Sequence, residues 1–296
     1  MAGETASTRG RATVVAVVAV LLVGTAAAWG LFVYDPAPTD PQRPAFLSAP
    51  DEPLPAPTES GPYQVTATMQ SNYPDSDRVL RTKVYYPDGS PVVKETTLRD
   101  GDGSVVKETT YRRGDREFVM ATVDSPSAFD RQVASDEVVQ ADPASLTYYE
   151  VDQETGPAAD IEPGQALQGL YLLRYEERGK TTYQGTQVVR YEAVDGWTTS
   201  AAIGDGEDAQ SVYVRQARGE VLVDADTGAI LKADVSGSVI KADKWADVMV
   251  EDSYSVTVTY EVDTSVEPPS EPPWVDSLER GNVTATGDEL RGPNGR

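Results

Sequence analysis

Two short motifs pair a serine with a lysine three residues later, the S-x-x-K spacing of penicillin-recognising enzymes. They are Ser104 to Lys107 and Ser238 to Lys241. That chemistry needs both side chains on one face of a helix. Both motifs lie in segments that alternate like strands, where residues three apart point to opposite faces. The accompanying S-D-N and K-T-G motifs are absent, so we interpret both matches as coincidental and predict no catalytic residue.

Acidic turns are the second set of residues that invite a chemical interpretation. The segment Asp100 to Ser104 starts like a calcium loop, but an EF-hand needs Gly at position six and Glu at position twelve. Those positions hold Val105 and Tyr111. A loose surface cation site at this turn stays open beside a plain hairpin turn. Asp224 and Asp226 are interpreted first as turn residues and second as ligands. We therefore predict no metal site and no cofactor.

The composition removes most catalytic side chains. The chain has no His and no Cys, which excludes a Ser-His-Asp triad, imidazole and thiolate metal sites, and disulfides. Walker A and G-x-G-x-x-G motifs are also absent. A carboxylate pair for glycoside hydrolysis stays open, but among 48 Asp and Glu residues no particular pair stands out. We expect a protein that is not an enzyme, with a carboxylate-dependent hydrolase as the catalytic alternative.

Acidic residues outnumber basic ones, 48 to 25, for a net charge of −23. This charge disfavours binding to nucleic acid and to anionic lipid headgroups. Lysine is scarce, with seven Lys against eighteen Arg. Many carboxylates and few lysines suit a surface that stays hydrated in concentrated salt, where screening removes self-repulsion. We interpret the chain as salt-adapted, with an ordinary acidic exported domain as the alternative.

An uncharged run from Ala12 to Tyr34 dominates the N-terminus. As a helix it is long enough to cross a bilayer at about 1.5 Å per residue. Arg9 and Arg11 precede it and acidic residues follow it, so the positive-inside bias places residues 1–11 in the cytoplasm and the main domain outside the cell. We predict a single-pass membrane anchor at residues 12–34.

Two other interpretations of this run stay open. A cleaved signal peptide would be cut near Thr25 to Ala28, although signal cores are shorter than this run. A buried core helix is the third interpretation. A lipid anchor on cysteine is excluded because the chain has no Cys.

Composition divides the rest of the chain into three parts. Residues 35–62 contain nine prolines, which favours an extended, semi-rigid stalk. Residues 63–266 form the predicted extracytoplasmic β-rich domain, and residues 267–296 form a Pro-rich and polar tail. In that tail Trp274 either docks on the domain or stays exposed, and Asn282 heads a sequon that makes it a candidate glycosylation site.

Short alternating segments rich in Val, Thr and Tyr, separated by Asp-Gly turns, predict an antiparallel sheet. We predict strands at 63–70, 79–86, 92–99, 105–112, 116–123, 182–194, 211–224, 229–241 and 253–263. Helices are predicted at 126–138 and 162–173, with Leu167, Leu170 and Leu173 on one face of the second. A repeat of Val-Val-Lys-Glu-Thr-Thr at 92–97 and 105–110 is interpreted as a duplicated hairpin in a larger sheet.

The hairpin from Gly219 to Ile230, with its Asp-x-Asp-Thr-Gly turn, resembles the LolA/RseB-like lipoprotein-carrier superfamily. The layout from Gln165 to Tyr260 is similar to membrane-attached proteins of haloarchaea with that kind of fold. The further residues of this likeness are Leu167, Leu170, Tyr175, Tyr183 to Thr186, Arg190 to Ala193, and Pro272, Pro273 and Trp274. The resemblance implies a mainly β (α+β) fold: a curved antiparallel half-barrel with covering helices, able to hold an acyl chain or a lipidated partner.

Two functions follow as hypotheses. The first is a membrane-anchored extracytoplasmic carrier-like protein for a hydrophobic or lipidated ligand. The second is a cell-surface structural or regulatory interaction module with a filled core. An apolar groove on the concave face would favour the first, and a packed face the second.

Overall fold

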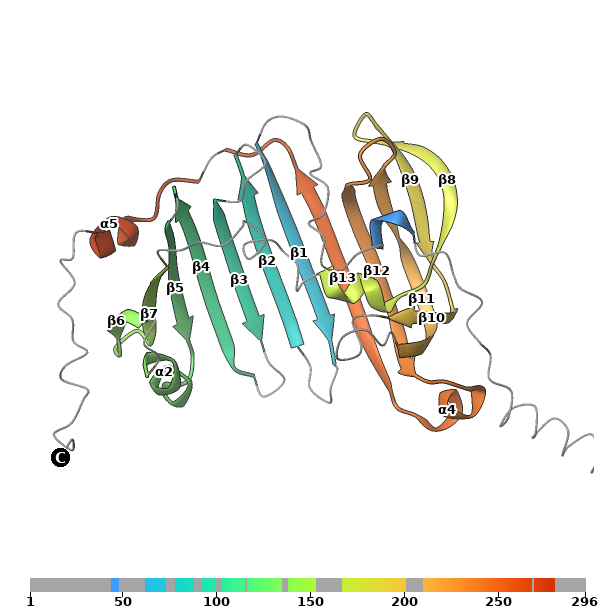
Figure 1. The fold of residues 1–296 in the computed structure, drawn as a ribbon, viewed down its shortest axis with the longest axis horizontal. Coiled ribbons are helices and arrows are strands. Elements are labelled where there is room, and N and C mark those ends of the chain that lie inside the picture. The colour runs from blue at the N-terminus through green and yellow to red at the C-terminus, as the bar shows by residue number, and fades with distance from the viewer. Residues whose placement is uncertain are drawn as a thin grey trace, which may run out of the picture.

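The protein, seen in a computed structural model, forms one large antiparallel sheet with few helices (Figure 1). The structure describes residues 44–47, 62–72, 78–87, 92–99, 103–114, 116–134, 138–152, 167–200, 210–267 and 269–279. The strands are β1 Tyr63–Ser71, β2 Arg78–Tyr86, β3 Val93–Arg99, β4 Val105–Arg113, β5 Arg116–Val123, β6 Val138–Asp142, β7 Thr147–Asp152, β8 Tyr175–Tyr183, β9 Thr186–Ala193, β10 Gly196–Ser200, β11 Gln210–Asp224, β12 Ile230–Lys241 and β13 Ser253–Asp263. The helices are α2 Pro126–Val133, α4 Trp245–Val250 and α5 Pro273–Glu279, with 3₁₀ helices η1 Ala45–Leu47 and η3 Gln168–Leu172.

The thirteen strands follow the order β6-β7-β5-β4-β3-β2-β1-β13-β12-β11-β9-β8, and β10 pairs with β11. The described strands leave the sheet open, with β6 and β8 at its two edges. The mainly β, antiparallel part of the predicted fold class is therefore confirmed. The predicted membrane helix at 12–34 lies outside the described residues. Within the described part of the chain, no helix is long and apolar enough to cross a bilayer.

Most predicted strands match observed ones, but the prediction of one continuous strand at 182–194 was wrong. It contains the end of β8, a two-residue turn and β9. The turn residues Gln184 and Gly185 both have positive φ, 49° and 87°, which is the backbone of a tight hairpin turn. Gln-Gly is not among the usual sequence signals for this turn, and the Thr and Tyr residues on both sides hid the break.

The two predicted helices are shorter than expected. The first ends at Val133, and Val138 already belongs to strand β6. The second is represented by η3, a 3₁₀ helix, while residues 162–166 lie outside the described part. The elements β6, β7, β10, α4 and α5 were not predicted. The repeat at 92–97 and 105–110 forms β3 and β4, which pair with each other, so the two copies make one hairpin.

Side chains alternate between two faces of the sheet. We call the face that carries Val256, Val258 and Tyr260 of β13 the inner face; these side chains are buried. The outer face of the same strand carries Ser255, Thr259 and other polar residues. The inner face packs against η3 and η1, which lie in front of β11 to β13 in Figure 1.

The covered face changes along the sheet. At β3 to β5 the outer face carries Val93, Tyr111 and Phe118, which pair across the strands. Val93 and Phe118 are buried, and α5 lies on this side. Figure 1 shows the segment after β13 crossing the top of the sheet to bring α5 beside β4 and β5.

Candidate binding face

The inner face is apolar across the neighbouring strands β2, β1, β13 and β12. One row runs Val84–Val65–Val262 from β2 through β1 to β13. A second row runs from Leu80 through Met69 and Val258 to Val235 on β12. All but Met69, which is partly buried, are buried. This continuous apolar surface is the largest in the described part of the chain.

The helix η3 supplies most of the cover on this surface. Leu170 of η3 and the flanking Leu167 and Leu173, which we call the η3 leucines, are buried against the inner face. A 3₁₀ helix has three residues per turn, so leucines three apart form one line. The predicted shared face of these leucines is confirmed, although the helix is not α-helical. The Tyr175 hydroxyl donates a hydrogen bond to the Leu170 carbonyl over 3.2 Å, and burial raises the pKa of Tyr175.

Two glycines let η3 approach the sheet closely. A Cβ atom on Gly169 would lie 2.5 Å from Cγ2 of Val258. A Cβ atom on Gly237 of β12 would lie 2.9 Å from Cδ2 of Leu173. Larger side chains would push η3 off the sheet. Over β12 and β13, the apolar inner face is therefore occupied by the leucines of the chain itself.

The helix η1 adds a second, smaller cover. Phe46 and Leu47 are buried in the same core. The Phe46 ring lies 5.7 Å from the Tyr175 ring and 5.1 Å from the Tyr191 ring, measured between centroids. We predicted these residues as part of the stalk. The apolar triplet Ala45-Phe46-Leu47, isolated among prolines, was the available signal for this contact.

A polar band follows on the inner face of β3 and β4. Its members are Lys94, Thr96, Glu108, Thr110 and Arg112. Thr110 is buried and its hydroxyl donates to Glu108 Oε1 over 3.4 Å. The Thr96 hydroxyl is buried and has no hydrogen-bond partner among the described residues. The inner face thus passes from an apolar to a polar surface at β3.

Beyond this band lies a second apolar cluster. It contains Ala121, Val123 and Tyr148 of β5 and β7, covered by Phe129 of α2. The polar band therefore lies between two apolar parts of one face.

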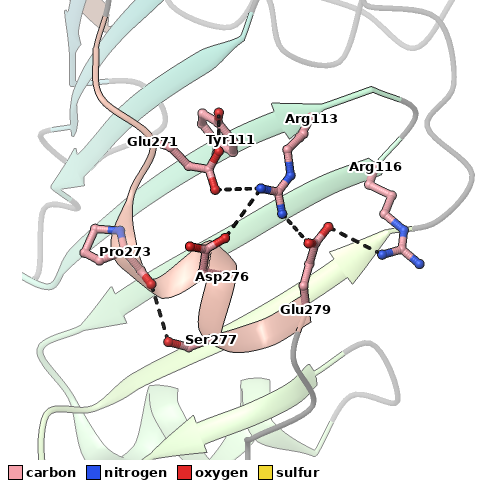
Figure 2. A network of polar contacts seen from close by, with 8 residues as sticks. All are labelled: Tyr111, Arg113, Arg116, Glu271, Pro273, Asp276, Ser277 and Glu279. Atoms are coloured by element: carbon pink, nitrogen blue, oxygen red, sulfur yellow. Dashed lines mark hydrogen bonds and ion pairs between the residues drawn. The ribbon is translucent and has the colours of Figure 1, made fainter.

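On the outer face, Arg113 of β4 binds two carboxylates of α5 and that of Glu271, just before the helix (Figure 2). Its Nη1 lies 2.7 Å from Glu271 Oε1 and 3.5 Å from Asp276 Oδ1, and its Nη2 binds Glu279. The hydrogen bond to Glu279 raises the pKa of Arg113. The Tyr111 hydroxyl also donates to Glu271, over 3.2 Å.

Apolar contacts complete the docking of α5. Val275 is fully buried, and the Trp274 ring lies 6.0 Å from the Tyr149 ring. Of the two alternatives for Trp274, the structure supports docking on the sheet. The sequence contained the Pro-Pro-Trp segment but no indication of which strands would receive it.

The other predicted residues have simple structural roles where the structure describes them. The Asp224 carboxylate accepts hydrogen bonds from the backbone N–H of Asp226 and Thr227, both 2.8 Å. Burial opposes ionisation, but these bonds lower the pKa of Asp224 overall. The interpretation of Asp224 as a turn residue is confirmed.

The motif Ser238 to Lys241 lies within β12, and Ser104 lies directly before β4. Neither serine is therefore paired with its lysine on one face of a helix. Asp100, Asp102 and the candidate glycosylation site Asn282 lie outside the described residues.

Comparisons with known proteins give only remote likenesses. No protein-family model and no curated protein matches the chain. Among solved structures, it is similar to a DUF1329 family protein from Desulfovibrio piger ATCC 29098, with 11% identity and a TM-score of 0.19 over 71% of this chain and 88% of that one. It is also similar to a putative outer membrane lipoprotein-sorting protein domain from Vibrio parahaemolyticus, with 12% identity and a TM-score of 0.18 over 75% and 91% of the two chains. These values are too low to assign the chain to either group.

Proposed function

We propose that this protein is a non-catalytic, extracytoplasmic binding protein that holds a hydrophobic or lipidated ligand on the inner face of its sheet. The single observation that carries the proposal is that the apolar inner face is much larger than the helix that covers it. The apolar inner face extends over β2, β1, β13, β12 and β11, whereas η3 has only five residues. The ligand would take the place of the η3 leucines.

The energetics allow this exchange. Exposing three buried leucines costs roughly 5–9 kcal/mol, and burying an acyl chain of about ten methylene groups returns about 8 kcal/mol. The polar band then suits the other end of an amphiphile, because Thr96 offers a buried hydroxyl with no partner in the described part. The proposed ligand is therefore an acyl chain with a polar end.

The location is part of the same proposal. The uncharged run at 12–34 would hold the protein in the cell membrane, with residues 1–11 in the cytoplasm and the sheet outside the cell. The acidic, lysine-poor composition supports a salt-adapted surface, as in haloarchaeal proteins.

Photo-crosslinking tests the proposal on the full chain in liposomes. A fatty-acyl probe with a photoreactive group should label inner-face peptides of β1 and β13 as well as the 12–34 segment. Val258→Trp fills the inner face and should remove the β13 label. Thr259→Trp is the matched control, since it changes the neighbouring outer-face position and should leave the label unchanged. Labels confined to 12–34 would overturn the proposal.

The second candidate function is a surface interaction module with a filled core. The close contacts at Gly169 and Gly237 favour it, because they leave no space between η3 and the sheet. This function predicts no inner-face label with the acyl probe, and crosslinks from exposed strands to another protein at the membrane. The same labelling experiment therefore separates the two candidates.

A further inference from the structure

Basic residues gather on one part of this acidic protein. Strands β2, β3 and β4 carry eight Arg or Lys residues and two Glu residues, in a chain whose net charge is −23. Five of these cations point to the outer face: Arg113, which is bound by acidic residues of the C-terminal segment, and Arg81, Lys83, Arg99 and Lys107. We call the last four residues the basic patch. We propose that at moderate ionic strength the basic patch docks on the anionic headgroups of the membrane that anchors the chain, a proposal that rests on the proposed anchor.

Strand register fixes the geometry of the patch. Arg81 pairs with Thr97, and Thr97 pairs with Lys107, so the three form one row across β2, β3 and β4. Strands lie about 4.8 Å apart, which puts the backbones of Arg81 and Lys107 roughly 10 Å from each other. Lys83 and Arg99 lie two residues along their strands, about 7 Å away. Four cations thus share an area comparable to a few lipid headgroups.

The patch is available for a partner. All four side chains are exposed, and none forms an ion pair with a described residue. By contrast, Arg113 on the same face is held by α5. Glu95, which pairs with Lys83, is the acid closest to the patch on these strands. The acidic turn residues Asp88, Asp100 and Asp102 lie outside the described residues.

Most of the neighbouring outer face does not oppose docking. Beside the patch, β1 presents Thr66 and Thr68, and β13 presents Thr257 and Thr259. These hydroxyls are uncharged and can bond to phosphate oxygens. Glu261 of β13 pairs with Thr66, which pairs with Lys83, so this exposed acid lies in the row of Lys83, and Asp263 ends the strand. The rows through Arg81 and Arg99 therefore carry no acidic residue from β13 to β4, whereas the row through Lys83 also carries Glu261 and Glu95.

The net charge of the whole chain does not determine how the basic patch interacts with the membrane. The Debye length is about 8 Å at 0.15 M ionic strength, so distant carboxylates are screened from the patch. Each Lys or Arg close to an anionic leaflet adds to the attraction between the patch and the membrane. The repulsion predicted from the composition of the whole chain therefore does not apply to this face.

The segment between the predicted anchor and η1, which we call the tether, keeps the patch within reach of the membrane. Tyr34 ends the predicted anchor, and Phe46 and Leu47 of η1 are buried against the sheet. The ten residues from Tyr34 to Pro44 span at most about 35 Å. A sheet lying flat, with a packed layer about 10 Å thick above it, fits inside this distance. The tether thus keeps the effective concentration of the patch at the surface high.

A single engineered cysteine tests the proposal, because the native chain has none. The full chain carrying Thr97→Cys with a fluorophore is placed in vesicles that contain a headgroup-linked quencher. We expect at least twofold stronger quenching in anionic than in zwitterionic vesicles, and a loss of this difference at 1 M NaCl, where the Debye length is about 3 Å. A label at Gln132→Cys on α2 should show no such difference. Circular dichroism at each salt concentration verifies that the sheet stays folded.

Charge reversal provides the matched control. Arg81→Glu with Lys107→Glu should remove the difference between vesicles. Arg131→Glu with Lys241→Glu changes the net charge equally, at exposed positions outside the patch, and should retain it. Equal quenching in both vesicle types would overturn docking while leaving the proposed anchor in place. A chain that washes off the vesicles at high salt would instead refute the anchor, and docking with it.

Discussion

Two covers of different physical character lie on opposite faces of the sheet, over different strands. At β1, β13, β12 and β11, the η3 leucines pack on an apolar inner face. At β4 and β5, α5 packs on the outer face, where Arg113 binds Asp276 and Glu279 of the helix and Glu271 just before it. The stability of the η3 cover should depend on the buried apolar area, and that of the α5 cover on ion pairs as well. One sheet thus buries apolar residues on both of its faces, with a different kind of cover on each.

The largest effect should come from truncating the centre of the η3 cover. Leu170→Ala removes a fully buried side chain and should cost about 3 kcal/mol of unfolding free energy. Denaturant titration of the full chain measures this. Leu172→Ala, at a partly buried position, is the control and should cost less. Equal costs at the two positions would mean that η3 does not pack as described.

Truncating the α5 cover should have a smaller effect. Val275→Ala removes buried apolar volume, and at about 0.8 kcal/mol per methylene-sized group the cost should be about 1.5 kcal/mol. Trp274 lies beside Tyr149, so its fluorescence should report the loosening of α5. An unchanged emission spectrum together with unchanged stability would contradict the docking of α5.

The hydrogen bond under η3 gives a pH-dependent prediction. Tyr175→Phe removes the donor to the Leu170 carbonyl and should cost about 1 kcal/mol near neutral pH. Burial raises the folded pKa of Tyr175 above its unfolded value, so this contribution is complete below pH 10 and is lost as the pH rises further. Stability measured between pH 8 and 11 should show the gap between wild type and variant narrowing. Leu172→Ala, which removes no titratable group, is the control and should show a constant gap.

The smallest effect on global stability should come from Arg113→Gln. The side chains in this network are at least one-third exposed, so salt screens them. We expect faster amide exchange in residues 273–279 of the variant at 0.1 M NaCl, and a smaller difference at 2 M. Arg116→Gln removes one longer contact, 3.6 Å to Glu279, and should change exchange less. A difference that is independent of salt would show that packing alone holds α5.

Local alternation was sufficient to predict most strands, because polar and apolar residues separate cleanly on strands such as β13. The Asp-Thr-Gly turn likewise predicted the hairpin of β11 and β12. The cover that α5 forms on the outer face was not predictable from the sequence. It depends on where α5 docks, and its contacts with Arg113 join residues more than 150 positions apart. The candidate binding face was implied only by the family resemblance, and its polar band became visible through strand register.

The most direct test of the binding face locks η3 onto the sheet. In this cysteine-free chain, Gly169→Cys with Val258→Cys would introduce two sulfurs at positions whose side chains would touch, within the reach of a disulfide. Uptake of a fluorescent acyl probe is then measured on the full chain in the oxidised and the reduced state. Because the predicted anchor is the same in both states, the difference in uptake reports binding to the sheet. The account predicts that uptake on the sheet is lost when the disulfide forms and returns on reduction. Equal uptake in both states would contradict the displacement of η3 by the ligand.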